Sequence, residues 1–203
     1  MDKIYNISVT FFYFIRIIHE VLMGRRKMDS NIIDRYLEGD KEAFEDLIIE
    51  YRESAIAFAK QYTKDSYLAE DMVQEAFAYV YVYRDRYNKK YSFKTYLYTI
   101  IKNKSIDYIR KNSRLSSLNE DIEVAATKDL EEEIILKEEK ETLKDCLQIM
   151  KKEYREIIYL YEYEELSQKE IASILNMSLP MVKVTLFRAR KKLKELYLKG
   201  GKA

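Results

Sequence analysis

Apolar residues from residue 29 onward recur every three to four positions, which is the spacing of one face of an α-helix. Two groups flank Gly39, where we expect a turn: Ile32, Ile33, Tyr36 and Leu37 precede it, and Phe44, Leu47, Ile48 and Tyr51 follow it. The residues TKDS at 63–66 then supply a break with capping side chains. A helix is predicted over about 67–84, with a buried face of Ala69, Met72, Val73, Ala76 and Val80.

A further long helix is predicted from Ser92 onward, with Ser92 as its N-cap. The composition then changes, because residues 119–141 hold ten acidic residues against three lysines and have a weak apolar period. We interpret 115–138 as an acidic linker, and helical periodicity resumes from residue 139. Scarce Gly and Pro favour helices throughout. The sequence therefore predicts an all-α protein of two small helical domains, 29–114 and 139–203.

Residues 1–28 differ from the rest of the chain. Their apolar run is interrupted by Arg16, His19 and Glu20, so it is marginal for a membrane span, and it lacks the cleavage site of a signal peptide. The residues GRRK at 24–27 can be encoded by a purine-rich ribosome-binding sequence just before Met28. We therefore interpret residues 1–27 as a translated leader and Met28 as the native start; an amphipathic N-terminal helix is the alternative.

The single proline marks the start of a helix. Ser167 and Glu170 form the S-x-x-E capping pattern of a short helix, and Asn176 and Met177 follow it as a tight turn. Ser178 is the expected N-cap of the next helix, and Pro180 lies in its first turn, where the missing N–H costs nothing. The segment therefore predicts a helix-turn-helix.

The second helix of this motif has two different faces. Its buried face is predicted to hold Val182, Leu186, Ala189, Leu193 and Leu196, and its outward face Lys183, Val184, Phe187, Arg188 and Lys191. From 180 to 203, eight cations stand against Glu195 alone. A cationic outward face on such a helix suits the DNA major groove. The alternative is a solvated basic helix end.

Two other segments have unusual surfaces. The outward face of the helix over 67–84 combines acidic and apolar residues, which indicates docking of a protein partner or, alternatively, burial against another helix: Asp71, Gln74, Glu75, Ala78, Tyr81, Val82 and Asp85. From 84 to 114, ten cations stand against two acids, with six aromatic rings interleaved. This pattern is typical of single-stranded nucleic-acid binding, but composition alone fits equally well with rings that belong to the core.

Composition disfavours an enzyme. Cys146 is the only cysteine and His19 the only histidine, which removes disulfides, cysteine zinc sites and the usual general base. The four glycines form no phosphate-binding loop. We expect no catalytic residue, no metal and no cofactor, and a reducing, cytoplasmic setting.

Taken in order, these segments resemble a bacterial RNA polymerase sigma factor of the extracytoplasmic-function (ECF) group of the sigma-70 superfamily. The resemblance covers 29–114 as region 2 and 139–199 as region 4. It is carried by GDKEAFEDLI, AEDMVQEAFAYVY, SFKTYLYTIIKNKSIDYIRK, LSQKEIASILNMS and VKVTLFRARKKL. It implies a specificity subunit that binds core polymerase, recognises the −35 and −10 promoter elements and helps to open the duplex.

The resemblance also implies roles for residues of region 2. Docking on the clamp coiled coil of the largest polymerase subunit is expected from Asp71, Gln74, Glu75, Phe77, Ala78 and Tyr81. Recognition and melting of the −10 element is expected from Tyr87, Tyr91, Ser92, Phe93, Lys94, Lys102, Asn103, Arg110, Lys111 and Arg114. Asn103 matches the asparagine near the pocket for a flipped base, and Tyr96 replaces a frequent tryptophan.

Region 4 is expected to read the −35 element as duplex DNA. The residues concerned are Ser178, Met181, Lys183, Val184, Phe187, Arg188 and Lys191. Val184 stands where Ser is common and Thr185 where Arg is common, so no promoter sequence is transferred. The implied partners are core polymerase, through its clamp and its flap, promoter DNA and an anti-sigma factor, with no membrane insertion. A helix-turn-helix regulator that works without polymerase is the rival interpretation, and it explains only 139–199.

Overall fold

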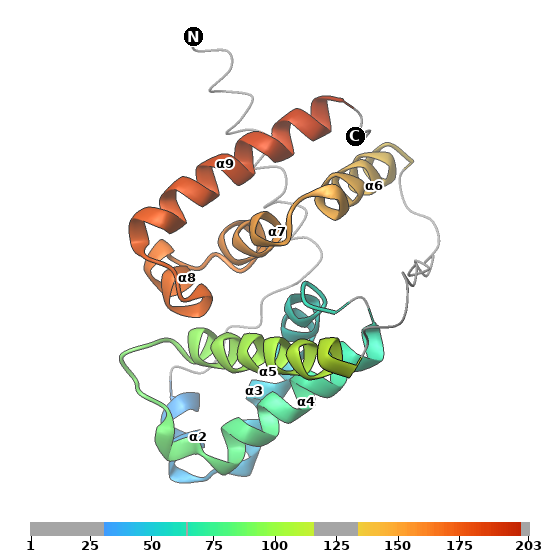
Figure 1. Ribbon diagram of the computed structural model, residues 1–203. Helices are drawn as coiled ribbons and strands as arrows, with labels where there is room; N and C mark the ends of the chain where they lie inside the picture. Colours follow the sequence, from blue (N-terminus) through green and yellow to red (C-terminus); the bar gives the residue numbers. More distant parts are fainter. Residues whose placement is uncertain (1–30, 64, 116–133, 200–203) are drawn as a thin grey trace. The chain divides into compact units, whose positions relative to one another are not determined.

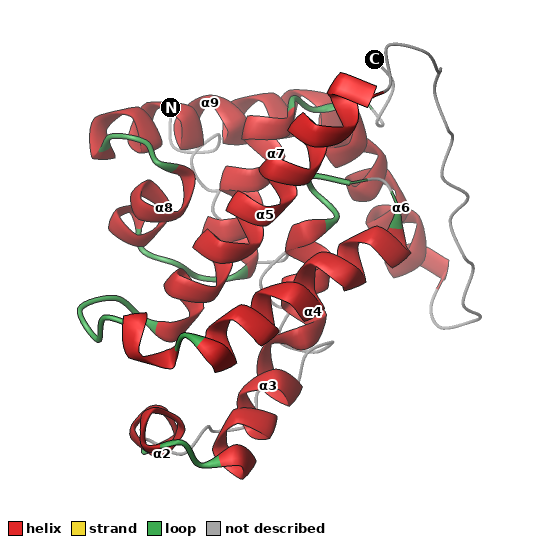
Figure 2. Ribbon diagram, turned by 60° about the horizontal axis from the view of Figure 1, so that its bottom comes forward, coloured by secondary structure: helices red, strands yellow, loops and turns green. Residues whose placement is uncertain are grey.

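The computed structural model describes residues 31–63, 65–115 and 134–199, and every regular element in these ranges is helical (Figure 1). Figure 2 shows helices joined by loops, with no strand in the described part of the chain. The prediction of an all-α protein is confirmed. The predicted leader, and most of the predicted acidic linker, lie outside the described residues.

The chain divides into two compact units, one centred on α2–α5 and the other on α6, α7 and α9. The first comprises α2 (Ile32–Glu38), α3 (Lys41–Ala59), α4 (Ser66–Val82), the 3-10 turn η1 (Arg84–Arg86) and α5 (Phe93–Leu115). Helix α3 packs against α2, α4 and α5, and α4 packs against α5. The predicted face of α4 is buried as a whole: Ala69, Met72, Val73, Ala76 and Val80.

Side-chain caps fix where two of these helices begin. The Asp65 carboxylate accepts hydrogen bonds from the backbone N–H groups of Tyr67 and Leu68 and starts α4. The Ser92 hydroxyl accepts from the N–H of Thr95 at 3.2 Å and starts α5, as the sequence predicts. Each cap satisfies an amide that has no partner inside its own helix.

Tyr36 joins four elements of this unit. Its side chain is 1% exposed, and its hydroxyl donates to the carbonyl of Val80 in the last turn of α4 at 2.7 Å. Its ring stacks on Phe44 of α3 and meets the edge of Phe93, the first residue of α5. Burial raises the pKa of Tyr36, so the hydroxyl stays neutral and donates its proton to the carbonyl.

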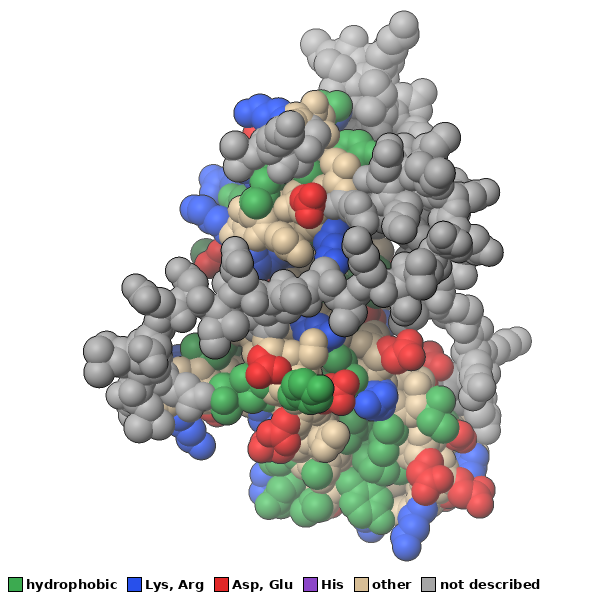
Figure 3. All heavy atoms as spheres, turned by 90° about the vertical axis from the view of Figure 1, so that its right-hand side faces the viewer, with side chains coloured by type: hydrophobic (Ala, Val, Ile, Leu, Met, Phe, Trp, Pro, Cys, Tyr) green, Lys and Arg blue, Asp and Glu red, His purple; other side chains and the backbone are tan. Residues whose placement is uncertain are grey.

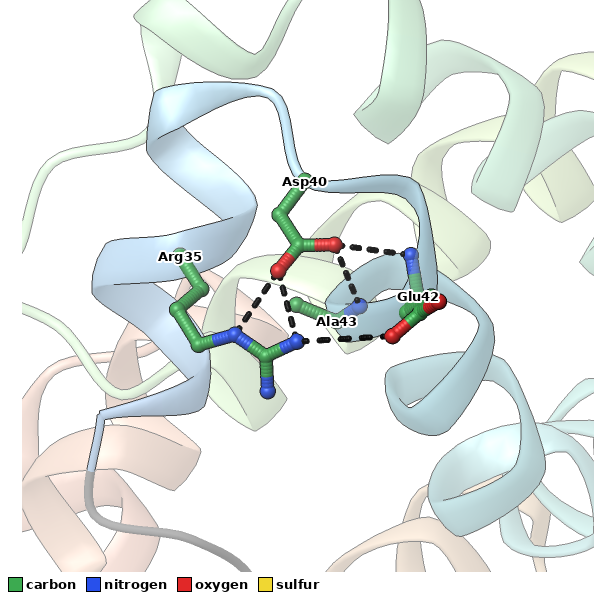
Figure 4. Close-up of polar contacts among 4 residues, drawn as sticks. All are labelled: Arg35, Asp40, Glu42 and Ala43. Atoms are coloured by element: carbon green, nitrogen blue, oxygen red, sulfur yellow. Dashed lines mark hydrogen bonds and ion pairs between the residues drawn. The ribbon is translucent and has the colours of Figure 1, made fainter.

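The corner between α2 and α3 depends on Gly39 and Asp40. Gly39 adopts φ 95°, a left-handed conformation that glycine accepts without the clash of a Cβ. One carboxylate oxygen of Asp40 caps α3 by accepting from the N–H groups of Glu42 and Ala43 (Figure 4). The other accepts from Nε of Arg35 at 2.7 Å, and this contact lowers the pKa of Asp40.

The second unit comprises α6 (Ile134–Ile149), α7 (Lys152–Ile158), the π-helical turn η2 (Tyr159–Tyr163) and α9 (Leu179–Leu198). Helix α9 packs against α6 and α7. Arg155 of α7 connects α7 to the end of α6. Its guanidinium donates hydrogen bonds to the backbone carbonyls of Gln148 and Met150. Cys146 is fully buried, and burial raises the pKa of its thiol.

A short helix, α8 (Gln168–Leu175), precedes α9. Among the described residues no single helix is long and apolar enough to span a membrane. Helices α8 and α9 taken together are long and apolar enough, but the chain bends by 101° between them.

We expect Tyr36→Phe to lower the free energy of unfolding by about 1 kcal/mol, because it removes one buried hydrogen bond and keeps the ring. Urea unfolding followed by circular dichroism measures this change. Tyr67→Phe is the matched control, since Tyr67 is 86% exposed. Equal effects of the two substitutions would contradict the role of the Tyr36 hydroxyl.

Asp40→Asn keeps a capping side chain and removes the charge that pairs with Arg35, so it should lower the melting temperature at neutral pH. A lowered pKa in the folded state means that the carboxylate stabilises the fold above its ordinary pKa and loses this effect as the pH falls through the folded pKa. The difference between Asp40→Asn and the unmodified chain should therefore shrink below about pH 4. A difference that stays constant with pH would rule out the ion pair as its cause.

Candidate functional site

Among the described residues, α9 buries one face and leaves the opposite face exposed. The predicted buried residues are all buried: Val182, Leu186, Ala189, Leu193 and Leu196. The five residues predicted for the opposite face are all exposed: Lys183, Val184, Phe187, Arg188 and Lys191. Met181 is also exposed. The spacing of apolar residues thus gave both faces of this helix correctly.

The turn before α9 has the geometry of a helix-turn-helix. Asn176 adopts φ 54°, and the N–H of Met177 donates back to the carbonyl of Ala172 at 3.0 Å. The Ser178 hydroxyl accepts from the N–H of Met181 and caps α9, as predicted. The bend of 101° between the two helices is typical of this motif. The capping box of Ser167 and Glu170 stays a prediction.

One cation of α9 does not belong to the outward face. Arg190 turns inward and donates through Nε to Glu162 of η2 at 2.6 Å, and its guanidinium lies over the ring of Tyr161. Burial raises the pKa of Glu162, while the Arg190 charge opposes this shift. In the sequence Arg190 belongs to the basic end of the helix, and nothing near it indicates this pair, because Glu162 lies 28 residues earlier and carries no motif.

The predicted outward face of α4 is largely exposed. Asp71, Gln74, Glu75, Ala78, Val82 and Asp85 are exposed, so the face mixes acidic and apolar groups. Tyr81 is half-buried and its ring packs against Phe44 of α3, so the alternative of burial against another helix applies to Tyr81 and not to the other six residues. The lower part of Figure 3 shows acidic and hydrophobic side chains next to one another on one side of the α2–α5 unit.

Phe77, which the family resemblance assigns to the docking surface, does not lie on this outward face. It is 5% exposed and its ring meets Phe44 of α3 edge to face, so it belongs to the core of the unit in this structure. Its contact with polymerase stays a prediction. Glu75, in contrast, forms an ion pair with Lys104 of α5 at 2.8 Å and remains accessible.

The segment between α4 and α5 carries both exposed and internal rings. Tyr91 is 43% exposed, and its carbonyl accepts a hydrogen bond from the Tyr87 hydroxyl at 2.7 Å. Tyr87 and Tyr96 are half-buried and in contact, and burial raises the pKa of each hydroxyl. Phe93 is 4% exposed and lies in the core of the unit, and its contact with DNA stays a prediction. The interpretation that these rings belong to the core thus fits Phe93, and binding of nucleic acid by the exposed ring of Tyr91 stays a prediction.

The polar residues predicted to contact the −10 element lie in α5 or directly before it. Ser92, Asn103, Arg110 and Lys111 are exposed, and Lys94 and Lys102 are half-buried. Arg114 lies in α5, but its side chain is outside the described residues. Tyr98 is fully buried and donates to the Ser54 hydroxyl, which is a core contact. Exposed polar and cationic residues thus follow the partly internal aromatic cluster along α5.

The described residues offer no group of three His, Cys, Asp or Glu side chains that could hold a metal ion. What they do offer is a cationic helix-turn-helix, a basic aromatic segment and a mixed acidic and apolar helix face. Their charge and exposure suit the binding of DNA and of protein.

Family models match both parts of the chain. The model "Sigma-70 region 2" matches residues 47–115, and "Sigma-70, region 4" matches residues 140–193. The first match covers the part that a helix-turn-helix regulator leaves unexplained, so that rival interpretation is not favoured.

Relatives and solved structures agree with these matches. The chain is 33% identical over 151 residues to the ECF RNA polymerase sigma factor SigM of Bacillus subtilis, covering 74% of this chain and 92% of that protein. It is 31% identical over 176 residues to SigW of the same organism, with 80% and 93% covered. Its fold is similar to the sigma factor RpoE of Bartonella quintana in complex with the anti-sigma factor NepR, with TM-score 0.62, 22% identity, and 77% of this chain and 97% of that chain covered. The chain therefore belongs to the ECF RNA polymerase sigma factors and serves promoter-specific initiation of transcription.

Proposed function

We propose that this sigma factor uses three separate surfaces in transcription initiation. The outward face of α4 docks on core RNA polymerase, the segment from Tyr87 to Lys111 binds and opens the −10 element, and the outward face of α9 reads the −35 element. The observation that carries the proposal is that α4 and α9 each bury one complete face and leave the opposite face exposed, with different chemistry on each. No catalytic step of its own is required, and the place of action is the cytoplasm, with the polymerase.

The α4 surface suits a protein and not a nucleic acid. Asp71 and Glu75 place negative charge on it, and Ala78 and Val82 continue it as an apolar strip. Phosphate would be repelled by the acids, whereas a basic helical partner with apolar side chains would complement both parts. We therefore assign the clamp coiled coil of the largest polymerase subunit to this face, through Asp71, Gln74, Glu75, Ala78 and Tyr81.

The region between α4 and α5 suits unpaired DNA. Exposed Tyr91 offers a ring face for stacking, which contributes roughly 1–3 kcal/mol per base in single-strand binding proteins. Arg110 and Lys111 supply charge for the phosphates, and exposed Asn103 offers donors and acceptors to a base turned out of the duplex. Because the rings of Tyr87 and Tyr96 pack on each other, this cluster presents a preformed edge to the strand.

The α9 surface suits the major groove of duplex DNA, which admits one α-helix. Lys183, Arg188 and Lys191 are exposed along it, and no acidic residue lies between residues 180 and 194. The partly buried pair of Arg190 and Glu162 holds the middle of α9 against η2 and so keeps the outward face in a fixed orientation.

An anti-sigma factor is the further partner that we propose. The support is that the RpoE structure of similar fold was determined with an anti-sigma factor bound. The exposed faces of α4 and α9 are the surfaces that such a protein would have to cover in order to prevent binding of polymerase and DNA.

The docking surface can be tested by replacing Asp71 and Glu75 together with Ala. We expect affinity for core polymerase to fall at least about ten-fold, equivalent to 1.4 kcal/mol, because both charges lie on the proposed interface. Fluorescence anisotropy of the labelled chain with core polymerase measures this. Glu45→Ala with Asp46→Ala is the matched control, since it removes two exposed acids from α3. Unchanged core affinity of the first variant would refute the docking assignment.

The upstream contact can be tested with Arg188→Ala. We expect the holoenzyme to lose about 1–3 kcal/mol of affinity for duplex DNA that carries the −35 element, as for removal of an arginine that contacts a base edge. Binding to labelled promoter fragments at a fixed salt concentration is the measurement. Lys60→Ala, an exposed cation after α3, should leave affinity unchanged. Equal affinities of the two variants would count against α9 as the reading helix.

A further inference from the structure

We infer that Met181, Val184 and Phe187 form an apolar patch on α9 that recognises the methyl groups of thymines in the upstream promoter element. The inference rests on the proposed function of α9 and specifies which chemical feature of the duplex it reads. These three side chains are 56%, 48% and 69% exposed, although they are among the larger apolar groups of the second unit.

The patch lies at the centre of the outward face. With about 100° between successive residues of an α-helix, Met181, Val184 and Phe187 span roughly 120° of the circumference. The buried stripe that includes Val182 and Leu186 lies on the opposite side of the helix. The patch therefore points directly away from the core of the unit.

Cations are interleaved with the apolar side chains. By the same helical geometry, Arg188 falls between Met181 and Val184, and Lys191 falls between Val184 and Phe187. Lys183 lies beyond Phe187, at the edge of the face. A surface for an apolar protein partner has few charges at its centre, whereas this patch has a cation between each pair of apolar groups. The arrangement favours a binding partner that is a polyanion and that also carries apolar groups.

Duplex DNA supplies one such apolar group to the major groove. The C5 methyl of thymine is the only hydrocarbon among the base edges there, and the other groups are hydrogen-bond donors and acceptors. Met181, Val184 and Phe187 have no hydrogen bond to offer to those groups. Lysines on the phosphates would bring the helix into the groove, and the apolar side chains would gain most where thymine methyls replace water.

The test uses the full chain with core polymerase. Upstream elements are first selected from a duplex library with randomised sequence at this position. Each thymine of the selected element is then replaced, one at a time, by deoxyuridine, which lacks only the methyl group. We expect affinity to fall about four-fold at each contacted thymine, the effect of withdrawing one buried carbon from contact.

Variants link the methyl groups to the patch. Phe187→Ala and Val184→Ala should each weaken binding to the thymine element and abolish the difference between thymine and deoxyuridine at one position. Lys60→Ala should keep that difference. Because Val184 and Phe187 are exposed, these substitutions leave the core intact, and thermal unfolding should confirm this.

Three results would overturn the inference. Equal affinity for thymine and deoxyuridine at every position, with an upstream element still selected, would refute methyl recognition and leave the proposed function standing. A loss of core affinity in Phe187→Ala, without DNA present, would assign the patch to a protein partner. Selection of no upstream element would refute the proposed function of α9 and this inference together.

Discussion

The hydroxyl of Tyr36 must find a hydrogen-bond partner inside the core, and it finds the carbonyl of Val80 in the last turn of α4. The same ring contacts Phe93, the first residue of α5. One side chain from α2 therefore fixes both ends of the segment that joins α4 to α5. That segment carries Tyr87, Tyr91 and Ser92, so the geometry of the surface that we propose for the −10 element depends on the buried side chain of Tyr36.

Each unit contains an amphipathic helix, α4 in the first and α9 in the second. A helix with one apolar stripe buries that stripe and leaves the opposite face without an internal partner. In α4 the remaining face is acidic and apolar, and in α9 it is cationic and apolar. Charges are divided between the interior and these faces: Arg190 is used internally against Glu162, whereas Arg188, two residues earlier, is left exposed. In α4 and in α9, the buried face thus stabilises the fold, and the opposite face is the one that we propose for binding.

Helical spacing and capping residues were sufficient to predict the all-α fold, both faces of α9, the buried face of α4 and the caps at Ser92 and Ser178. The family resemblance assigns Phe77 and Phe93 to binding surfaces, yet both rings lie in the core, against Phe44 of α3 and Tyr36 of α2. The π-helical turn at 159–163 and the pair of Arg190 with Glu162 could not be predicted, because nothing near either residue in the sequence indicates its partner.

The central claim is that one chain contains both a polymerase-docking surface and promoter-reading surfaces. In vitro transcription with purified core polymerase and a library of genomic DNA fragments tests it most directly. The claim predicts discrete transcripts that appear only when this chain and core polymerase are both present, with start sites that share elements near −35 and −10. Tight binding of the chain to duplex DNA without any core-dependent initiation would contradict it.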